Sequence, residues 1–282
     1  MQLSQAQLKG RIKSMAKMNQ ADPRILIRIY MMERFLERVS MSRYKNNFII
    51  KGGILVTSLI GIALRSTMDI DTTLKNLNLS EEDIRVVIQE ICSINLEDNV
   101  KFQLKEISHI MDDLEYPGIR VTLNAFLEKM PVPMKIDIST GDIITPREIQ
   151  YSYKLLLEDR SIPLWTYNLE TLLAEKLQTI LARGTLNTRM RDFYDLYELT
   201  QTLPDKISIS TLKKAFAATC RKRSTSILLS SGRTILEKLQ KDKYLPKLWN
   251  GYQRKYSYAA GITYSEVIQS AMAVFEMACS EN

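Results

Sequence analysis

The amino-acid sequence predicts an α+β fold with a small mixed sheet and a helical C-terminal lobe. Helical periodicity marks the N-terminal region, strand-like segments gather between residues 65 and 139, and only helices are expected beyond Ser208. Such segregation along a chain is typical of α+β proteins or of separate domains. We therefore expect a first domain over residues 1–155, with N-terminal helices and the sheet, and a helical domain over residues 156–282.

Three helices are predicted from apolar residues at three- and four-residue steps. The first covers residues 23–38, and Pro23 suits its first turn. Its apolar stripe consists of Ile25, Ile29, Met32 and Leu36. Two further amphipathic helices are expected over residues 168–183 and 189–202.

Four segments are predicted to be strands. Residues 65–74 alternate in polarity and are rich in Thr and Ile, which is typical of a strand. Three more strand-like segments cover residues 101–107, 118–126 and 134–139. After the first strand, Ser80 is expected to begin a helix with a capping box, since Asp83 follows three residues later.

The composition narrows the possible chemistry. The chain has 282 residues, 45% of them hydrophobic and 25% charged, as in ordinary globular proteins. No apolar run approaches the roughly 18 residues of a membrane span, and residues 1–20 do not read as a secretory signal. Three widely spaced cysteines and a single histidine argue against disulfides, a zinc site and Ser-His-Asp catalysis, and indicate a cytoplasmic protein. We expect the chemistry to depend on carboxylates, Lys and Arg.

The net charge of +7 is unevenly distributed. Residues 1–39 carry 8 basic and 3 acidic side chains, residues 40–200 carry 18 and 23, and residues 201–282 carry 13 and 6. An acidic middle suits a metal-binding core, and basic ends suit a polyanion, although solvated helix faces would give the same charge. Aromatic and basic residues also interleave near the C-terminus, as in a surface that stacks bases or in a helical core. They are Lys243, Tyr244, Lys247, Trp249, Tyr252, Arg254, Lys255, Tyr256 and Tyr258.

The strongest chemical signal is a Gly-Gly pair followed by an Asp-x-Asp pair. Gly52 and Gly53 precede a helix that is predicted from Ile54 to Leu59. The first N–H groups of a helix favour an anion such as phosphate. Asp69 and Asp71 lie two residues apart in a predicted strand, so their carboxylates share one face. Neighbouring carboxylates favour Mg²⁺ or Mn²⁺. A phosphate-binding turn beside a metal-binding strand is what transfer of a nucleotide from an NTP requires.

A third carboxylate is expected to complete such a site. Asp137 lies between two apolar residues of the predicted strand at 134–139, so its side chain points away from the core. Asp112, Asp113 and Asp142 are alternatives in polar, loop-like surroundings. The pattern favours Asp137.

A second group of candidates lies in the predicted helices at 168–183 and 189–202. Lys176 and Arg183 are two turns apart on one helix face, where they would meet phosphates. Glu170 lies six residues before Lys176, Arg191 and Asp195 are four residues apart, and Asp192 and Asp195 are three apart. Ordinary salt bridges on a helix surface would produce the same pattern.

Together these motifs resemble the AbiEii/AbiGii family of nucleotidyltransferase-like toxins from abortive-infection and toxin–antitoxin systems. Residues 51–74, the strand around Asp137 and residues 170–199 carry the resemblance, which spans roughly residues 20–260. It implies a polymerase-β-like nucleotidyltransferase core followed by a helical lobe. The wider superfamily often has Gly-Ser where this chain has Gly52-Gly53, so a serine hydroxyl that would contact phosphate is missing here.

The resemblance also implies roles for single residues. Those implied to be catalytic are Asp69, Asp71, Asp137, Lys176 and Asp192, of which the first three are expected to bind metal. Those expected to contact the nucleotide are Gly52, Gly53, Arg65, Thr67, Arg183, Arg191 and Asp195.

The function implied is that of a toxin that uses Mg²⁺ or Mn²⁺ and an NTP to transfer a nucleoside monophosphate to an acceptor. The expected acceptor is RNA, most simply the 3′ end of a tRNA, and the expected effect is growth arrest in a toxin–antitoxin or abortive phage infection system. A cognate antitoxin encoded alongside is implied, with or without direct binding. Two alternatives stay open: binding of a nucleotide such as GTP without transfer, and transfer to a protein or a small molecule.

Overall fold

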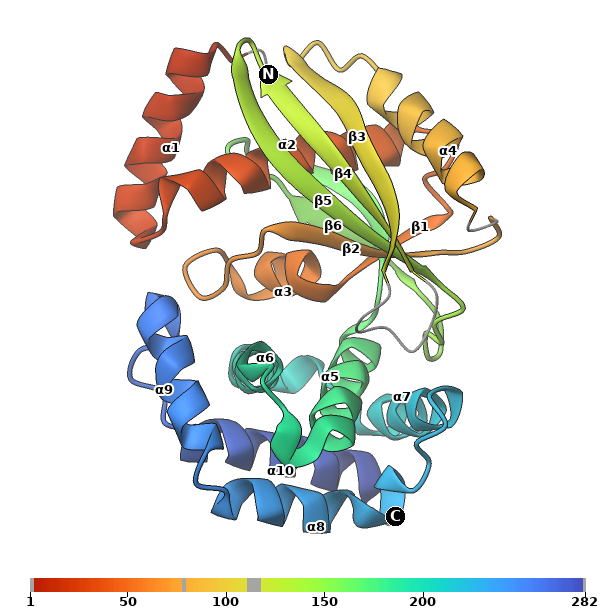
Figure 1. Cartoon of the computed structure of the whole chain (residues 1–282), viewed down its shortest axis with the longest axis vertical. Coiled ribbons are helices and arrows are strands. Elements are labelled where there is room, and N and C mark those ends of the chain that lie inside the picture. Colours follow the sequence, from red (N-terminus) through yellow and green to blue (C-terminus); the bar gives the residue numbers. More distant parts are fainter. Residues whose placement is uncertain (1–2, 78–79, 111–117, 281–282) are drawn as a thin grey trace. The chain divides into compact units, whose positions relative to one another are not determined.

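The structure is a computed structural model that describes residues 3–77, 80–110 and 118–280. The chain forms two compact units. The first consists of Met1–Asp142 and Ile149–Thr166, and the second of Ile143–Glu148 and Tyr167–Asn282. Strands and helices occur together in the first unit, and helices make up the second, so the predicted α+β class is confirmed (Figure 1).

A mixed sheet of seven strands forms the centre of the first unit, as far as the chain is described. The strand order is β3-β4-β5-β2-β1-β7-β6, and the pairs β2–β5 and β1–β7 are parallel while the other pairs are antiparallel. The strands are β1 (Phe48–Lys51), β2 (Asp69–Leu74), β3 (Val100–Ile110), β4 (Gly118–Leu127), β5 (Met130–Thr140), β6 (Ile149–Lys154) and β7 (Ser161–Thr166).

The two faces of this sheet differ in chemistry because side chains alternate along each strand. On one face Ile70, Ile136, Ile138 and Val121 are buried in the hydrophobic core. Residues one position away, such as Asp71, therefore project from the opposite face. The central strands thus hold a polar row on the face that the core does not occupy.

Four helices accompany the sheet: α1 (Gln5–Asn19), α2 (Pro23–Met41), α3 (Gly52–Ile60) and α4 (Glu81–Ser93). The apolar sides of α1, α2 and α4 contribute to the core, and Figure 1 shows α2 crossing the sheet and α4 beside β3. Pro23 stands in the first turn of α2, as predicted, after Asp22, whose side chain accepts a hydrogen bond from the N–H of Arg24. Ser80 caps α4, as predicted, by accepting from the N–H of Asp83, and its hydroxyl donates to the Asp83 carboxylate at 2.7 Å; the reciprocal half of the predicted capping box stays a prediction.

The second unit is built from helices. They are α5 (Leu169–Arg183), α6 (Met190–Thr202), α7 (Ile209–Lys222), α8 (Leu228–Lys241), α9 (Leu245–Lys255) and α10 (Tyr264–Cys279). The last of these, α10, packs against α5, α6, α7 and α8. Asn168 caps α5 by accepting from the N–H of Thr171, and Thr263 forms a capping box with Glu266 at the start of α10.

The aromatic residues near the C-terminus divide between core and surface. Trp249 is fully buried and donates from Nε1 to the carbonyl of Ile262 at 2.7 Å, and Tyr252 is also buried. Tyr244 is exposed, and Tyr256 is half-buried. The helical-core interpretation is therefore confirmed for Trp249 and Tyr252, whereas Tyr244 lies on the surface.

The four predicted strands are present, although the first begins at Asp69 and not at Arg65, and the structure adds β1, β6 and β7. The expected domain boundary after residue 155 falls between β6 and β7, which pair with each other. Because β7 also pairs with β1, the segment Ile149–Thr166 belongs to the first compact unit. The assignment of functions to two domains stays a prediction.

A buried glutamate links α2 to the segment between β6 and β7. Glu33 is 2% exposed, and its two carboxylate oxygens accept from the N–H of Leu156 at 2.9 and 3.0 Å. Burial raises the pKa of Glu33 to about 8, against the opposing effects of that hydrogen bond and of nearby Arg34. The protonated form is therefore the stable one in the folded protein at neutral pH.

We expect this group to make stability depend on pH. Between the ordinary glutamate pKa and about 8, the folded chain binds a proton that the unfolded chain has released, so the free energy of unfolding falls as pH rises. Glu33→Gln should reduce that fall between pH 5 and 8 by roughly 2–4 kcal/mol. Urea titrations across this range measure it, with Glu82→Gln on the exposed side of α4 as the control. Parallel stability curves for wild type and Glu33→Gln would contradict the assignment.

Candidate active site

The Gly-Gly turn joins β1 to α3 and lies directly against β2. Gly52 has a positive φ of 62°, and a Cβ atom there would come within 2.1 Å of Oδ2 of Asp71. The N–H of Gly53 donates to the same oxygen at 3.2 Å. A Cβ on Gly53 would lie 2.6 Å from Oγ1 of Thr67. Both glycines are therefore required by the close approach of backbone to side chains.

Four charged residues form a row across four neighbouring strands. Lys51 of β1 pairs with Asp71 of β2, Asp71 pairs with Asp137 of β5, and Asp137 pairs with Arg120 of β4. Directly opposite residues in a sheet share a face, so the four side chains project together in the order plus, minus, minus, plus. Asp69 lies two residues before Asp71 on this face and pairs with Lys135 of β5.

Burial and mutual repulsion affect the predicted metal-binding carboxylates. Burial raises the pKa of Asp71, and the negative charge of Asp137 raises it further. The same two causes, in the same order, raise the pKa of Asp69. Because a nearby cation would relieve both effects, this part of the sheet is electrostatically suited to a positive ligand.

The third predicted carboxylate, Asp137, already has a cationic partner. Nε and Nη2 of Arg120 donate to its two oxygens at 2.8 and 2.7 Å. The hydrogen bond to Asp137 in turn raises the pKa of the Arg120 guanidinium. Bidentate pairs of this kind are among the stronger charge-assisted contacts in proteins.

Asp142, one of the alternative third carboxylates, joins the other end of the polar row. Its Oδ2 accepts from Nζ of Lys51 at 2.5 Å and from Oγ of Ser139 at 2.6 Å, and it also accepts from the hydroxyl of Thr73. Burial alone would raise the pKa of Asp142, but Lys51 and these hydrogen bonds lower it to about 2. Asp142 is therefore an ionised partner of Lys51. The other two alternatives, Asp112 and Asp113, lie outside the described residues.

These positions show which metal ligation the structure supports. Within the described parts of the chain, no three Asp, Glu, His or Cys side chains are grouped to hold a metal ion. Asp69 and Asp71 share one face of β2, whereas Asp137 is bound by Arg120. Two carboxylates suffice for Mg²⁺ where substrate phosphates and water complete its shell. A three-carboxylate site stays a prediction.

Arg65 and Thr67, the other predicted nucleotide contacts in the first unit, pack against the Gly-Gly turn. Arg65 is 1% exposed and Thr67 is 4% exposed. Atoms of both side chains are nearest to the position that a Cβ on Gly53 would occupy. Thr67 also donates to the carbonyl of Asp69 at 3.3 Å. They lie where they hold the glycine turn against β2, and direct contact with a nucleotide stays a prediction.

In the second unit, Lys176 lies between two carboxylates of α6. Its Nζ donates to Oδ2 of Asp195 at 2.6 Å and to Oδ1 of Asp192 at 3.2 Å, and all three side chains are at least nine-tenths buried. Arg189 also contacts Asp192, at 3.2 Å. The structure therefore groups three of the predicted residues into a buried ion cluster.

The other charged residues singled out in the second unit, Arg183, Arg191 and Glu170, lie outside this ion cluster. Arg183 is the last residue of α5 and is half-buried. Arg191 donates to the hydroxyl of Tyr256 at 3.0 Å and lies over its ring, with the guanidinium carbon 5.6 Å from the ring centre. Glu170 accepts from the N–H of Ser208 at 2.8 Å, so this member of the group stabilises the start of α7.

Sequence reasoning did not select the two cations of the polar row. Lys51 stands directly before the Gly-Gly pair, which was a usable signal. Arg120 is a single charge between Ile119 and Val121 of a predicted strand, the same pattern that identified Asp137. Its partner could not be read from the sequence, because the pairing of β4 with β5 sets it.

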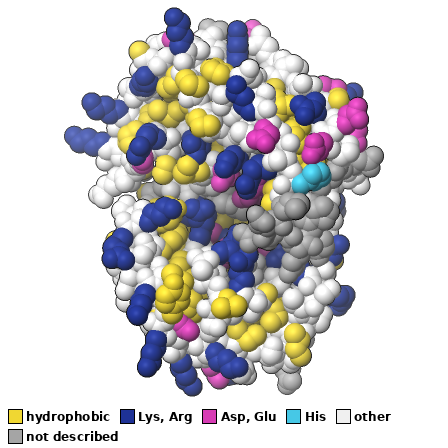
Figure 2. Space-filling view, in the orientation of Figure 1, with side chains coloured by type: hydrophobic (Ala, Val, Ile, Leu, Met, Phe, Trp, Pro, Cys, Tyr) yellow, Lys and Arg dark blue, Asp and Glu magenta, His cyan; other side chains and the backbone are white. Residues whose placement is uncertain are grey.

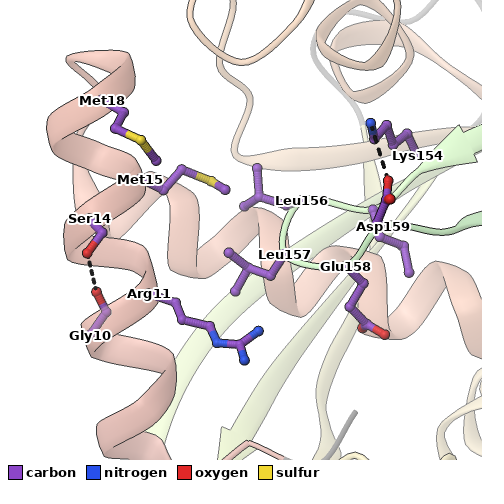
Figure 3. Close-up of a pocket in the computed structure, with 11 residues that line it drawn as sticks. Gly10, Arg11, Ser14, Met15, Met18, Lys154, Leu156, Leu157, Glu158 and Asp159 are labelled. Carbon is purple, nitrogen blue, oxygen red and sulfur yellow. Dashed lines mark hydrogen bonds and ion pairs between the residues drawn. The ribbon is translucent and has the colours of Figure 1, made fainter.

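A groove of about 550 Å³ lies elsewhere in the first unit, between α1 and the segment that follows β6 (Figure 3). Met15, Met18, Leu156 and Leu157 provide its apolar lining, and Arg11 and Lys154 are among its charged residues. None of the predicted catalytic or nucleotide-binding residues lines it. The charged row on the sheet is thus separate from this groove.

We expect Gly53→Ala to destabilise the first unit through contact with Thr67. The added Cβ would overlap Oγ1 of Thr67, and overpacking of this kind costs about 1–3 kcal/mol. Thr67→Ala removes that oxygen, so the double variant should recover part of the loss in urea denaturation. Gly251→Ala in α9, where a Cβ meets nothing within 4 Å, is the control. Strictly additive effects of the two changes would argue against the contact.

Lys176→Met is expected to destabilise the second unit strongly. It leaves the buried carboxylates of Asp192 and Asp195 without their shared cation, and loss of one partner of a buried pair costs about 3–5 kcal/mol. Denaturant midpoints measure the effect, with the exposed Lys238→Met as the matched control. Equal midpoints for the two variants would exclude a structural role for Lys176.

Comparison with known proteins identifies the family. The family described as nucleotidyl transferase AbiEii toxin, type IV TA system, matches residues 34–270. None of the curated proteins matches the sequence.

Solved structures with some likeness to this chain share little sequence with it. A protein from H. pylori described as a candidate nucleotidyltransferase is 16% identical, with a TM-score of 0.47 over 90% of this chain and 96% of that one. JHP933 from Helicobacter pylori is 15% identical, with a TM-score of 0.46 over 90% and 93%. An antigenic nucleotidyltransferase-like protein from Paracoccidioides brasiliensis is 14% identical, with a TM-score of 0.37 over 70% and 90%. The family match, which covers most of the chain, is decisive: this protein belongs to the AbiEii nucleotidyl transferase toxins of type IV toxin–antitoxin systems.

Proposed function

We propose that this protein transfers a nucleoside monophosphate from an NTP to an RNA acceptor, with Mg²⁺ or Mn²⁺ held by Asp69 and Asp71. One observation carries the proposal. Two carboxylates of β2 share a face, and one of them lies against the backbone of the Gly52-Gly53 turn. A divalent ion at the carboxylates and a triphosphate at the turn would then be neighbours.

The chemistry of these groups supports such a pairing. The raised pKa values of Asp69 and Asp71 reflect partly buried carboxylates with a like-charged neighbour, which a divalent ion would stabilise in their ionised form. The first N–H groups of α3 provide donors for phosphate oxygens at the positive end of a helix. When bound, the metal would act as a Lewis acid toward the reacting phosphate.

The surface of the helical unit favours a nucleic-acid acceptor. Dark-blue Lys and Arg side chains are spread over the face of this unit shown in Figure 2, where acidic side chains are fewer. Along α9 and the residues before it, the exposed cations are Lys243, Lys247, Arg254 and Lys255, and Tyr244 is 59% exposed beside them. Cations that hold phosphates and tyrosines that stack on bases suit single-stranded RNA. The proposed acceptor is the 3′ end of a tRNA.

Family membership supports the biological setting that we propose. The type IV classification implies an antitoxin partner, which we expect to be encoded alongside. We propose that the toxin acts in the cytoplasm, where modified tRNA would halt translation and arrest growth during phage infection. Among the described residues, no helix is both long and apolar enough to cross a bilayer.

The proposal predicts that Asp69→Asn and Asp71→Asn each abolish transfer. Asparagine keeps the shape of the side chain and removes the charge that would hold the metal. Labelled NTPs, Mg²⁺ and total RNA should give labelled RNA with the wild type and at least a hundredfold less with either variant. Asp159→Asn, at a fully exposed aspartate of the same unit, is the control and should label RNA normally.

Three results would contradict this function. Full labelling by both asparagine variants would exclude the metal site. GTP binding with no product on any acceptor would favour a nucleotide-binding module, and label found on protein instead of RNA would change the acceptor. Sequencing of RNA 3′ ends from growth-arrested cells identifies the added nucleotide and the acceptor together.

A further inference from the structure

We infer that Arg120 is a built-in counter-ion that competes with divalent metal for Asp137 and so limits metal binding by the carboxylate row. The inference deepens the proposed function and rests on it. Arg120 is a positioning residue here, since it acts through Asp137. In the absence of metal it holds that carboxylate, and a divalent ion gains it only when the guanidinium leaves.

The backbone fixes the two partners opposite each other. Arg120 and Asp137 are paired positions within a β4–β5 ladder that runs from Gly118–Ser139 to Leu127–Met130. Both guanidinium contacts are short, at 2.8 and 2.7 Å, and they occupy both oxygens of the carboxylate. Both carboxylate oxygens of Asp137 are then engaged, which limits their binding of another cation on the same side.

Their positive charges make the Arg120 guanidinium and a divalent ion compete for the same carboxylates. Arg120 interacts through space with Asp69 and Asp71 as well as with Asp137, so its charge acts on every carboxylate of the site. A guanidinium and a divalent ion in this small area would repel each other, because both carry positive charge. Metal bound by Asp69 and Asp71 would therefore be opposed by Arg120 as long as the pair with Asp137 is intact.

The exposure of the two side chains allows the exchange. The Arg120 side chain is 39% exposed and that of Asp137 is 21% exposed. Arg120 is thus able to turn toward solvent without opening the core, which lies on the other face of the sheet. The buried Lys51–Asp142 pair, at 14% and 6%, has no such freedom.

Metal binding without nucleotide tests the inference, and Mn²⁺ titration followed by electron paramagnetic resonance measures it. We expect Arg120→Met to bind Mn²⁺ at least tenfold more tightly than the wild type. Lys135→Met is the matched control, because it removes one positive charge from the same face and Lys135 acts on Asp69 only through space. It should change the affinity less than threefold. Adding Asp137→Asn to Arg120→Met should return the affinity to within threefold of the wild type.

The outcomes separate this inference from the proposed function. If the wild type binds Mn²⁺, Asp69→Asn weakens it and Arg120→Met binds no more tightly than Lys135→Met, then the inference alone is wrong. If neither the wild type nor any of the variants binds Mn²⁺, the proposed metal site is wrong as well. Arg120→Gln provides a second neutral variant should the methionine variant not fold.

Discussion

The contact between the Gly-Gly turn and Asp71 is the constraint on which the candidate site depends. A carboxylate oxygen lies so close to Gly52 that no side chain fits there, and the N–H of Gly53 binds the same oxygen. This contact ties the start of α3 to β2, and the proposed function places the triphosphate and the divalent ion on its two sides. Side-chain atoms of Arg65 and Thr67 lie within 3.2 Å of the position that a Cβ on Gly53 would take, so there is no room for a larger residue there. Close packing of the turn therefore determines where the Asp71 carboxylate lies.

The periodicity of apolar residues predicted many of the helices and strands, whereas the pairing of strands in the sheet could not be predicted from the sequence. The helices at residues 23–38, 168–183 and 189–202 carry regular apolar stripes and were found at nearly their observed bounds. Three strands were missed: β1 has only four residues, β6 is mostly exposed and so lacks a regular apolar alternation, and β7 contains Pro163, which disfavours a strand. Asp69, Asp71 and Asp137 could be chosen because each lies on the polar side of a strand. Lys51 and Arg120 carried comparable local signals, but their partners could not be read from the sequence, because strand order and register set them.

The second group of predicted residues illustrates how burial changes the meaning of a motif. Lys176 and Asp192 read from the sequence as charges on helix surfaces, yet in the structure they are nine-tenths buried together with Asp195. A buried ion cluster joins α5 to α6 with directional contacts, and removal of one member leaves the others without compensation. Loss of activity in variants at these positions therefore has to be separated from loss of folding. The carboxylate row of the sheet differs, since Asp69 and Asp137 are only partly buried.

The strand order also determines when the candidate site comes into existence. Its parts come from β1, β2, β4 and β5, and β5 lies between β4, which directly precedes it in the chain, and β2, which ends far earlier, at Leu74. A chain emerging from the ribosome therefore lacks the Asp71–Asp137 neighbourhood until β5 has been synthesised and inserted beside β2, and β1 gains its second partner only with β7. Contacts between such distant segments form late in folding. Nascent and truncated chains that stop before β5 lack Asp137 beside Asp71, so they cannot assemble the carboxylate row.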